Sequence, residues 1–507
     1  MQRRNHDDNH TETELSLGKL AKIGKNSILY WLASIIPQAI SFFLLPIYTR
    51  YVTPTDYGIL ALLAALTSPL GVILSLQLNT AVLRFFFAYE GSERSNYLGT
   101  MIIFLLVYAL PIALGLIFFG KPLFEIMFKS EALTFYPFIV WQIIITYLNL
   151  LWVVPSVIYK ARQEAGKWVS LTMASYILGT ALTYYFIIVH REGALGIIRA
   201  SLITQSIMCL VYIRITIQNA SPNFQWSKLK ESLIFSVPLL PSAFTSRLFE
   251  ISDRWFIERF WDLTQVGLYS LAFKFGLILN LFYTASGSAW MPVFFDIANK
   301  DELEAKRLLS KTITVWAAGG GLITLGLGLF SKEVIMLMTS PKYHPAYAVV
   351  PLMAFTSLLM GMRFFPRYAF LYAKKTKAIL IIALIHPGII FALNFLLVPR
   401  YGMFGAAYSA LLANVASSIV TYLLIQRYFP LRLEYAKLTK IISMLVILLV
   451  VLNLFSTGSW FFDIPIKIGA LLAYCLGLVY FGIIEKGWLI LIKDNLNLNS
   501  IIRALKM

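Results

Sequence analysis

Charged residues interrupt three long apolar stretches in the second half of the chain. The stretches cover residues 233–257, 266–295 and 346–372, and the charges within them are Arg247, Glu250, Asp253, Arg254, Lys274, Arg363 and Arg367. A charge at the centre of a membrane costs at least ~2.5–3.5 kcal/mol, so such residues usually face a polar cavity and carry function. Basic residues outnumber acidic ones here. The pattern therefore predicts an internal site for an anionic ligand.

The first stretch carries two arginines and two acids. Arg247, Glu250 and Arg254 are spaced i, i+3 and i+7, which places them on one helix face, whereas Asp253 lies about 100° around the helix from Arg254. Two interpretations are open. Either Glu250 neutralises the arginines in a structural network, or an anion such as a phosphate displaces Glu250 and binds the guanidinium groups, which suit phosphate oxygens. Glu250 and Asp253 are also the acids within these stretches that could carry a coupling proton.

Five other basic residues are candidates for contact with the same phosphate groups. Lys274 lies eight residues into its stretch, where its stem reaches either a cavity or the membrane surface. Arg363 and Arg367 are spaced i, i+4 and are expected on one face, with Arg363 the deeper of the two. Arg199 and Arg84 lie near the ends of two earlier stretches. Each of them is expected to contact either lipid head groups or the ligand.

The composition is that of a polytopic membrane protein. Of 507 residues, 59% are hydrophobic and only 13% are charged, and the mean hydropathy is +0.73. Soluble domains are about 45–50% apolar and about 25% charged. A spanning helix needs roughly 20 apolar residues. By that rule we expect an all-α fold with about fourteen spans: 26–48, 57–83, 98–119, 137–159, 168–189, 194–216, 233–257, 266–295, 311–330, 346–372, 378–398, 402–426, 438–455 and 463–484.

The positions of lysine and arginine predict the orientation of these spans. Most of the 43 Lys and Arg residues lie on the side of the N-terminus when the spans are followed along the chain. Because positive loops stay on the cytoplasmic side, both termini are expected in the cytoplasm. The net charge of +18 therefore reflects topology, and no nucleic-acid partner is expected.

The loops and motifs exclude most enzyme classes. The longest expected outer loop, 120–136, is too short for a catalytic domain. Glycines 319–321 lack the Lys-Ser/Thr that follows in a P-loop, so close helix packing is expected there. Cys209 and Cys475 lie in apolar runs without a CxxC motif. We therefore expect a protein that is not an enzyme and that uses no cofactor, metal or disulfide.

Two glycine motifs recur at one offset and indicate an internal duplication. Gly58 and Gly267 are 209 residues apart, and so are Gly193 and Gly402. Six spans per repeat return the chain to the same side, so two parallel six-helix lobes are expected, with a substrate site between them that is exposed alternately. The expected order is a disordered cytoplasmic tail, an N-terminal lobe, a cytoplasmic linker, a C-terminal lobe, and two further spans with a cytoplasmic tail: 1–25, 26–217, 218–232, 233–427 and 428–507.

Several motifs, in order over the first twelve spans, are similar to those of one transporter family. They are Pro54-Thr55-Asp56-Tyr57-Gly58, Pro238-Leu239-Leu240-Pro241-Ser242, Ser252-Asp253-Arg254, Val266-Gly267-Leu268-Tyr269-Ser270-Leu271-Ala272 and the segment from Tyr401-Gly402 to Gly405-Ala406-Ala407. They resemble the polysaccharide transporters of the multidrug/oligosaccharidyl-lipid/polysaccharide flippase superfamily. The resemblance implies fourteen helices in two lobes, and movement of an undecaprenyl-diphosphate-linked glycan from the inner to the outer leaflet.

This resemblance leaves the substrate open. The expected partners are the lipid-linked glycan and membrane lipids, with a polymerase and a chain-length regulator of the same pathway, and the chain is expected to be a monomer. A cation-coupled drug exporter on the same scaffold is an alternative, but it needs a membrane-embedded carboxylate, and the first six spans contain no Asp or Glu. Lipid II or a teichoic-acid precursor is a third substrate class that the residues do not distinguish.

Overall fold

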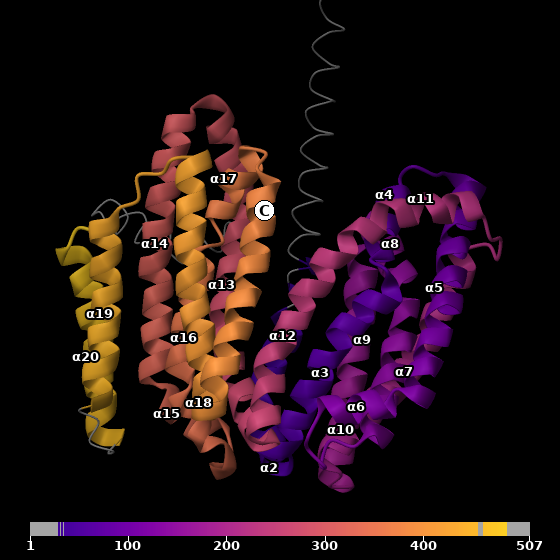
Figure 1. Ribbon diagram of the computed structural model, residues 1–507, viewed down its shortest axis with the longest axis horizontal. Helices are drawn as coiled ribbons and strands as arrows, with labels where there is room; N and C mark the ends of the chain where they lie inside the picture. The colour runs from indigo at the N-terminus through magenta and orange to yellow at the C-terminus, as the bar shows by residue number, and fades with distance from the viewer. Residues whose placement is uncertain (1–28, 31, 34, 455–459, 484–507) are drawn as a thin grey trace, which may run out of the picture. The chain divides into compact units, whose positions relative to one another are not determined.

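The fold is built from helices throughout the part of the chain that the structure describes. The computed structural model describes residues 29–30, 32–33, 35–454 and 460–483 (Figure 1). The expected tails at 1–25 and after 483 lie outside the described residues. Contacts divide the chain into two compact units, Met1–Gly267 and Leu268–Met507. The expected lobe boundaries at 218–232 stay a prediction.

The first unit contains long membrane helices and several short ones. Its elements are α2 (Leu45–Tyr51), α3 (Pro54–Ser75), α4 (Leu78–Phe85), α5 (Gly91–Phe119), α6 (Lys121–Met127), η1 (Phe135–Ile139), α7 (Val140–Asn149), η2 (Leu150–Trp152), α8 (Val153–Ala161), α9 (Ala165–Tyr184), η3 (Tyr185–Val189), α10 (Gly193–Asn219), α11 (Trp226–Ser236), η4 (Val237–Leu239), α12 (Leu240–Phe260) and the start of α13 (Leu263–Lys300). Buried side chains of α4, α5, α8, α10 and α11 form one core, in which Tyr97 donates to or accepts from Ser232 at 3.0 Å.

The second unit continues with α13 and ends with two C-terminal helices. Its further elements are α14 (Glu302–Leu329), α15 (Ser331–Met338), η5 (Pro341–Ala348), α16 (Val350–Met362), α17 (Pro366–Tyr372), α18 (Thr376–Tyr428), α19 (Tyr435–Leu454) and α20 (Trp460–Tyr480). Helix α14 packs against α16, α19 and α20. Gly320 and Gly321 of α14 leave room for the hydroxyls of Tyr283 and Tyr474, where an added Cβ would come closer than 3.0 Å. The expectation of close packing at these glycines is therefore confirmed.

The described residues contain fewer candidate membrane spans than the sequence predicts. Among the described residues, ten helices are long and apolar enough to cross a membrane, or eleven if η5, α16 and α17 count as one bent span. One of them, residues 377–428 of α18, covers two expected spans and turns at Gly402 (φ +56°). Helix α12 carries six charged residues, so it does not pass a test for spans that is based on hydropathy and charge. The all-α polytopic fold is confirmed, but the count of fourteen is not.

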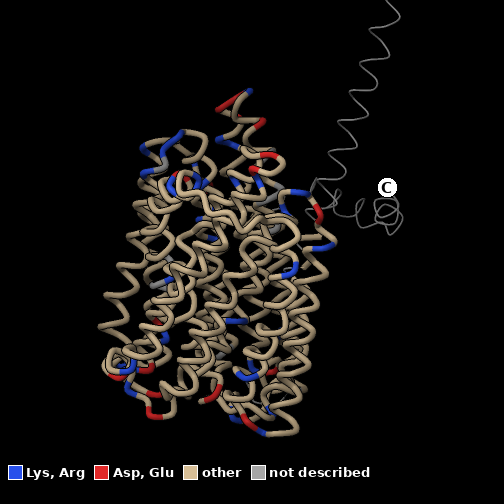
Figure 2. Tube along the Cα trace, turned by 90° about the vertical axis from the view of Figure 1, so that its right-hand side faces the viewer, with Lys and Arg blue, Asp and Glu red and all other residues tan. Residues whose placement is uncertain are grey.

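Charged side chains are concentrated at the two ends of the helices. Figure 2 shows Lys, Arg, Asp and Glu gathered there, with few charges in the middle section of the trace. This distribution is the one a membrane protein requires, because charges within the hydrocarbon region are costly. The charges that do lie between the ends are therefore the ones that need an explanation.

The start of α3 crosses the start of α13 with backbone against backbone. The Oγ1 atoms of Thr55 and Thr264 lie 3.0 Å apart, and these residues are separated by the offset of the expected duplication. The contact is reciprocal: a Cβ added at Gly58 would clash with the Leu263 carbonyl, and one added at Gly267 would clash with the Pro54 carbonyl. Pro54 and Leu263 are related by the same offset. Such mutual contact is what two parallel repeats related by a two-fold axis produce.

The capping residues of α3 explain the Pro-Thr-Asp-Tyr-Gly motif. Thr53 and Asp56 form a capping box, in which the Asp56 N–H donates to Thr53 Oγ1 and the Thr53 N–H donates to Asp56 Oδ2. The other carboxylate oxygen of Asp56 accepts from the Ala194 N–H at 3.1 Å, at the beginning of α10. One acid thus caps two helices and fixes the position of Gly58 in the crossing.

Candidate functional site

A break in a membrane helix of the second unit brings polar groups together. Helix α16 ends at Met362, the turn 363–365 follows, and α17 starts at Pro366. Proline has no N–H and clashes with the preceding helical turn, so the ladder is interrupted here. Irregular backbone at membrane depth is tolerated where it is buried in protein or lines a polar cavity. Arg363 is the first residue of this break.

Arg363 has a single hydrogen-bond partner in the described part of the chain. Its Nη2 donates to Oδ1 of Asn414, a buried residue of α18. The Asn414 amide is held in turn, because its Nδ2 donates to the Ala410 carbonyl at 2.8 Å. The Arg363 Nε is buried without an acceptor, and none of the ion pairs among described residues involves this guanidinium. The site therefore holds a positive charge with unused donor capacity.

His386 hydrogen-bonds to α18 one turn from Asn414, the partner of Arg363, and it was not anticipated from the sequence. Its Nδ1 is 3.0 Å from the Oγ of Ser417 and 3.4 Å from the carbonyl of Ala413, both in the second half of α18. Arg363 acts electrostatically on the half-buried ring. The available signal was a lone histidine within the apolar stretch 378–398. Asn414 and Ser417 could not be assigned to the site, because only the packing of α16 against α18 brings them to Arg363.

The expectation that Arg363 and Arg367 share one helix face stays a prediction, and the structure gives the two side chains different exposure. The i, i+4 rule requires an unbroken helix, and the turn 363–365 separates the two residues. Arg363 is half-buried and contacts Asn414, whereas the Arg367 side chain is exposed. Only Arg363 takes part in the polar cluster.

The basic residues of α12 and α13 differ in exposure. Arg247 and Lys274 have exposed side chains, Arg254 is half-buried, and Asp253 is buried with 8% of its surface exposed. The side chain of Glu250 lies outside the described residues, so its expected pairing with either arginine stays a prediction. Lys274 belongs to the second unit, whereas α12 belongs to the first.

Arg199 has protein partners at the start of α10. Its guanidinium forms an ion pair with Glu192, and its Cζ lies 5.8 Å from the ring centre of Trp141 and 5.5 Å from that of Phe186. A cation held against two aromatic rings and a carboxylate is satisfied without a ligand. We therefore leave Arg199 out of the proposed site.

Arg84 lies at the end of α4, in an aromatic and charged cluster. Its Cζ is 4.4 Å from the ring centre of Phe235 in α11, and the side chain remains exposed. Nearby, the Tyr89 hydroxyl donates to Glu231 Oε2 at 2.8 Å. Burial, and then this hydrogen bond, raise the pKa of Tyr89 to about 12, so the phenol stays protonated at neutral pH. An exposed guanidinium stacked on a ring is suited to phosphate groups at the membrane surface.

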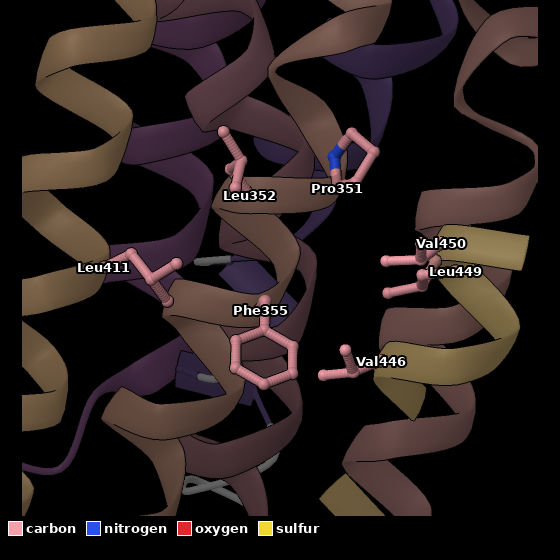
Figure 3. Close-up of a pocket in the computed structure, with 7 residues that line it drawn as sticks. All are labelled: Pro351, Leu352, Phe355, Leu411, Val446, Leu449 and Val450. Atoms are coloured by element: carbon pink, nitrogen blue, oxygen red, sulfur yellow. The ribbon is translucent and has the colours of Figure 1, made fainter. Parts of the chain in front are cut away.

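One apolar cavity lies away from the charged residues. A cavity of about 450 Å³ between α16, α18 and α19 is lined only by Pro351, Leu352, Phe355, Leu411, Val446, Leu449 and Val450 (Figure 3). It offers no donor to an anion and is suited to hydrocarbon. Within the described residues, no group of three His, Cys, Asp or Glu side chains could hold a metal ion.

Comparison with known proteins gives the family. The model of the family described as "Polysaccharide biosynthesis protein" matches residues 23–298, more than half of the chain. The chain belongs to this polysaccharide biosynthesis protein family. The match includes the crossing of α3 with α13 and all of α12.

Relatives of this polysaccharide biosynthesis protein support the assignment. The Haemophilus influenzae "Lsg locus putative protein 1" is 22% identical over 70% of this chain and 86% of its own length. The Staphylococcus aureus "Capsular polysaccharide biosynthesis protein CapF" is 21% identical over 80% of this chain and 100% of its own length. The family and the apolar helices make the chain a multi-pass membrane protein.

Solved structures show that the fold is that of known transporters. The lipid II flippase MurJ, in an inward closed conformation, matches with a TM-score of 0.72 at 16% identity, covering 90% of this chain and 98% of that chain. An inward-facing multidrug resistance MATE family transporter of the MOP superfamily matches with a TM-score of 0.58 at 15% identity, covering 81% and 98%. At these identities the likeness concerns the fold alone.

Proposed function

We propose that this protein is a flippase for an undecaprenyl-diphosphate-linked oligosaccharide. It moves the lipid from the cytoplasmic to the outer leaflet of a bacterial inner membrane by alternating access, for cell-surface polysaccharide biosynthesis. The protein acts as a transporter rather than an enzyme. A polymerase and a chain-length regulator of the same pathway are its proposed partners, and the chain works as a monomer.

The observation that carries this proposal is that the Arg363 guanidinium has no acidic partner among the described residues. A buried guanidinium needs a counter-charge, and Arg363 has a neutral amide, an unused Nε–H and no carboxylate among the described residues. A phosphate oxygen supplies both the charge and the missing acceptor. Asn414, fixed by Ala410, orients the guanidinium before the ligand arrives. The polyprenyl chain needs no polar site and remains in the lipid.

The other basic residues are assigned to the same task. We propose that Arg247, Arg254, Lys274 and Arg367 make further phosphate contacts, and that Arg84 contacts the diphosphate at the cytoplasmic surface. Glu250 and Asp253 are proposed as charge partners of the α12 arginines in the empty protein. A cationic drug would be repelled by Arg363, so the drug-exporter alternative is less well supported. Lipid II and teichoic-acid precursors carry the same diphosphate and are distinguished only by their glycans.

Complementation of a deletion strain tests the proposal. Arg363→Gln should reduce surface glycan by about tenfold or more, because a hydrogen bond to a charged group contributes about 1.5–3 kcal/mol. Arg363→Lys should retain part of the export, because it keeps the charge but loses the planar fork. Arg400→Gln is the matched control, since Arg400 is exposed in the same unit. The diphosphate-linked glycan should accumulate in the cell when export stops.

Two results would contradict the proposal. Wild-type export from Arg363→Gln, at equal protein level, removes Arg363 from the site. A deletion strain that changes its drug resistance but keeps its surface glycan removes the substrate class. Accumulation of lipid II instead of another diphosphate-linked glycan assigns the chain to that substrate.

A further inference from the structure

We propose that His386 is a proton-binding residue whose protonation is linked to occupation of Arg363 by an anion. The inference rests on the anion site proposed at Arg363 and adds its regulation. Neither the family nor any relative's description assigns a role to this histidine. His386 lies in α18, which packs against α16 and α17 on either side of the turn 363–365.

The hydrogen bonds of His386 determine which nitrogen takes the proton. Nδ1 lies near the Ser417 hydroxyl (3.0 Å) and the Ala413 carbonyl (3.4 Å). A carbonyl can only accept, so the arrangement favours a proton on Nδ1 and leaves a lone pair on Nε2. No hydrogen bond to Nε2 occurs within the described part of the chain, and the ring is half-buried. Nε2 is therefore the atom that accepts an added proton.

Protonation of His386 depends on the charged groups that surround its ring. Helices α16 and α17 pack against α18, and His386 hydrogen-bonds to residues 413 and 417 in the second half of α18. Helix α16 contains no charged residue, Arg367 of α17 is exposed, and Arg427 of α18 lies at its far end. The hydroxyls of Tyr368 and Tyr372 are engaged by backbone carbonyls of α13. Arg363 and His386 hydrogen-bond to Asn414 and Ser417, which lie one turn apart on α18, so the guanidinium is the charge that this arrangement brings to the ring.

Linkage follows from this arrangement. In the empty site a second positive charge on His386 would face Arg363 at membrane depth, where like charges repel strongly. An anion on Arg363 removes that repulsion and attracts the imidazolium. By thermodynamic reciprocity, protonation of His386 strengthens anion binding by the same factor that the anion strengthens protonation. Binding is therefore tighter at lower pH, and ligand addition takes a proton from solution.

The test uses the full-length protein in detergent with P1,P2-dimethyl diphosphate as the probe. This diester has the charged group of a lipid-linked glycan, and its charge is constant between pH 5.5 and 8. For the wild type, the dissociation constant should fall by up to about tenfold per pH unit through the titration of His386. His386→Gln should bind with a flat pH profile. His190→Gln, which changes an exposed histidine of the first unit, should behave as the wild type.

Proton uptake gives an independent measurement. Addition of the probe in weak buffer near neutral pH should raise the pH for the wild type and for His190→Gln, but not for His386→Gln. Ser417→Ala keeps the ring but removes its hydrogen-bond partner. It should shift the midpoint of the binding profile, and it replaces His386→Gln if that variant does not fold.

The outcomes separate this inference from the proposed function. If wild type and His386→Gln bind the probe with the same pH dependence, the inference is overturned while the anion site stands. The same conclusion follows if the wild type binds the probe without proton uptake. If the wild type does not bind the probe at any pH, the anion site at Arg363 is overturned, and the linkage with it.

Discussion

The crossing of α3 with α13 gives the sharpest prediction for stability. Gly58→Ala should destabilise the protein, because the new methyl group would occupy the space of the Leu263 carbonyl and approach the Gly267 nitrogen to 3.2 Å. Both obstacles are backbone atoms, which cannot rotate away as a side chain can. The two helix starts must therefore separate. Gly267→Ala should act in the same way, since its Cβ would meet the Pro54 carbonyl.

The size of the effect can be estimated from the contacts that change. Inserting a methyl group into a closely packed contact costs about 1–3 kcal/mol. Separation of the helices also breaks the hydrogen bond between Thr55 and Thr264, which contributes about 1 kcal/mol. Alanine recovers up to about 1 kcal/mol through its higher helix propensity. Gly58→Ala should therefore lower the free energy of unfolding by about 1–3 kcal/mol.

Thermal unfolding in detergent checks this estimate, with the buried Cys209 thiol as the reporter for a thiol-reactive dye. The matched control is Gly71→Ala in the same helix, where an added Cβ meets nothing within 4 Å. It should leave the unfolding temperature unchanged or raise it. The double variant Gly58→Ala/Gly267→Ala should lose less than the sum of the single losses, because the first substitution already separates the helices. Additive losses, or a Gly58→Ala variant as stable as the control, would refute the reasoning.

Three further predictions concern contacts within single units. Cysteines at Thr55 and Thr264 should form a disulfide under mild oxidation and stop export until a reductant is added; efficient cross-linking with normal export would show that the crossing stays closed during transport. Glu258→Ala should speed trypsin cleavage after Lys129, because Glu258 Oε1 accepts from the N–H groups of residues 129 and 130 at 2.8 and 2.7 Å; an unchanged cleavage rate contradicts this. Lys467→Met should lower the free energy of unfolding by about 3–5 kcal/mol, because it leaves Glu333 buried without its partner. Adding Glu333→Leu should restore most of that loss. Unfolding midpoints of the single and double variants test this, and a double variant no more stable than Lys467→Met contradicts it.

The fold could be predicted from the sequence where a span is uniformly apolar. Helices α5 and α9 were expected as spans 98–119 and 168–189, because no charge lies within those stretches. Helix α12 shows where prediction from composition fails, because it is long enough to cross a membrane but carries too many charged residues to be recognised as a span. The ends of helices were less predictable. Gly91–Phe119 begins seven residues before the expected span, because α5 continues beyond the apolar stretch into polar residues.

The candidate site was predictable only in part. The position of Arg363 within its apolar stretch identified it as the deepest cation of that stretch. The turn before Pro366 and the different exposure of Arg363 and Arg367 could not be predicted from their spacing. Glu192 lies seven residues before Arg199, on the same helical face, and this spacing could have revealed the ion pair. The partners His386 and Asn414 depend on packing between distant segments, which spacing along the chain does not report.

The two expected repeats differ at the positions that form the anion site proposed at Arg363. This difference predicts how many anions one chain binds. The first half of the chain also contains a short irregular segment, η2 between α7 and α8, but at the offset of 209 residues the turn 363–365 corresponds to residues 154–156, inside α8. At the duplication offset of 209 residues, the positions of Arg363, His386, Asn414 and Ser417 are occupied by Val154, Ile177, Gln205 and Met208. Val154 is fully buried and Ile177 is exposed, so neither can offer a charge to an anion. At the expected duplication offset, only the second set of positions carries a guanidinium and an imidazole. One diphosphate analogue should therefore bind per chain in calorimetry, with Arg363→Gln abolishing the signal. Two equivalent sites would mean that the first repeat also binds the anion, by residues other than these.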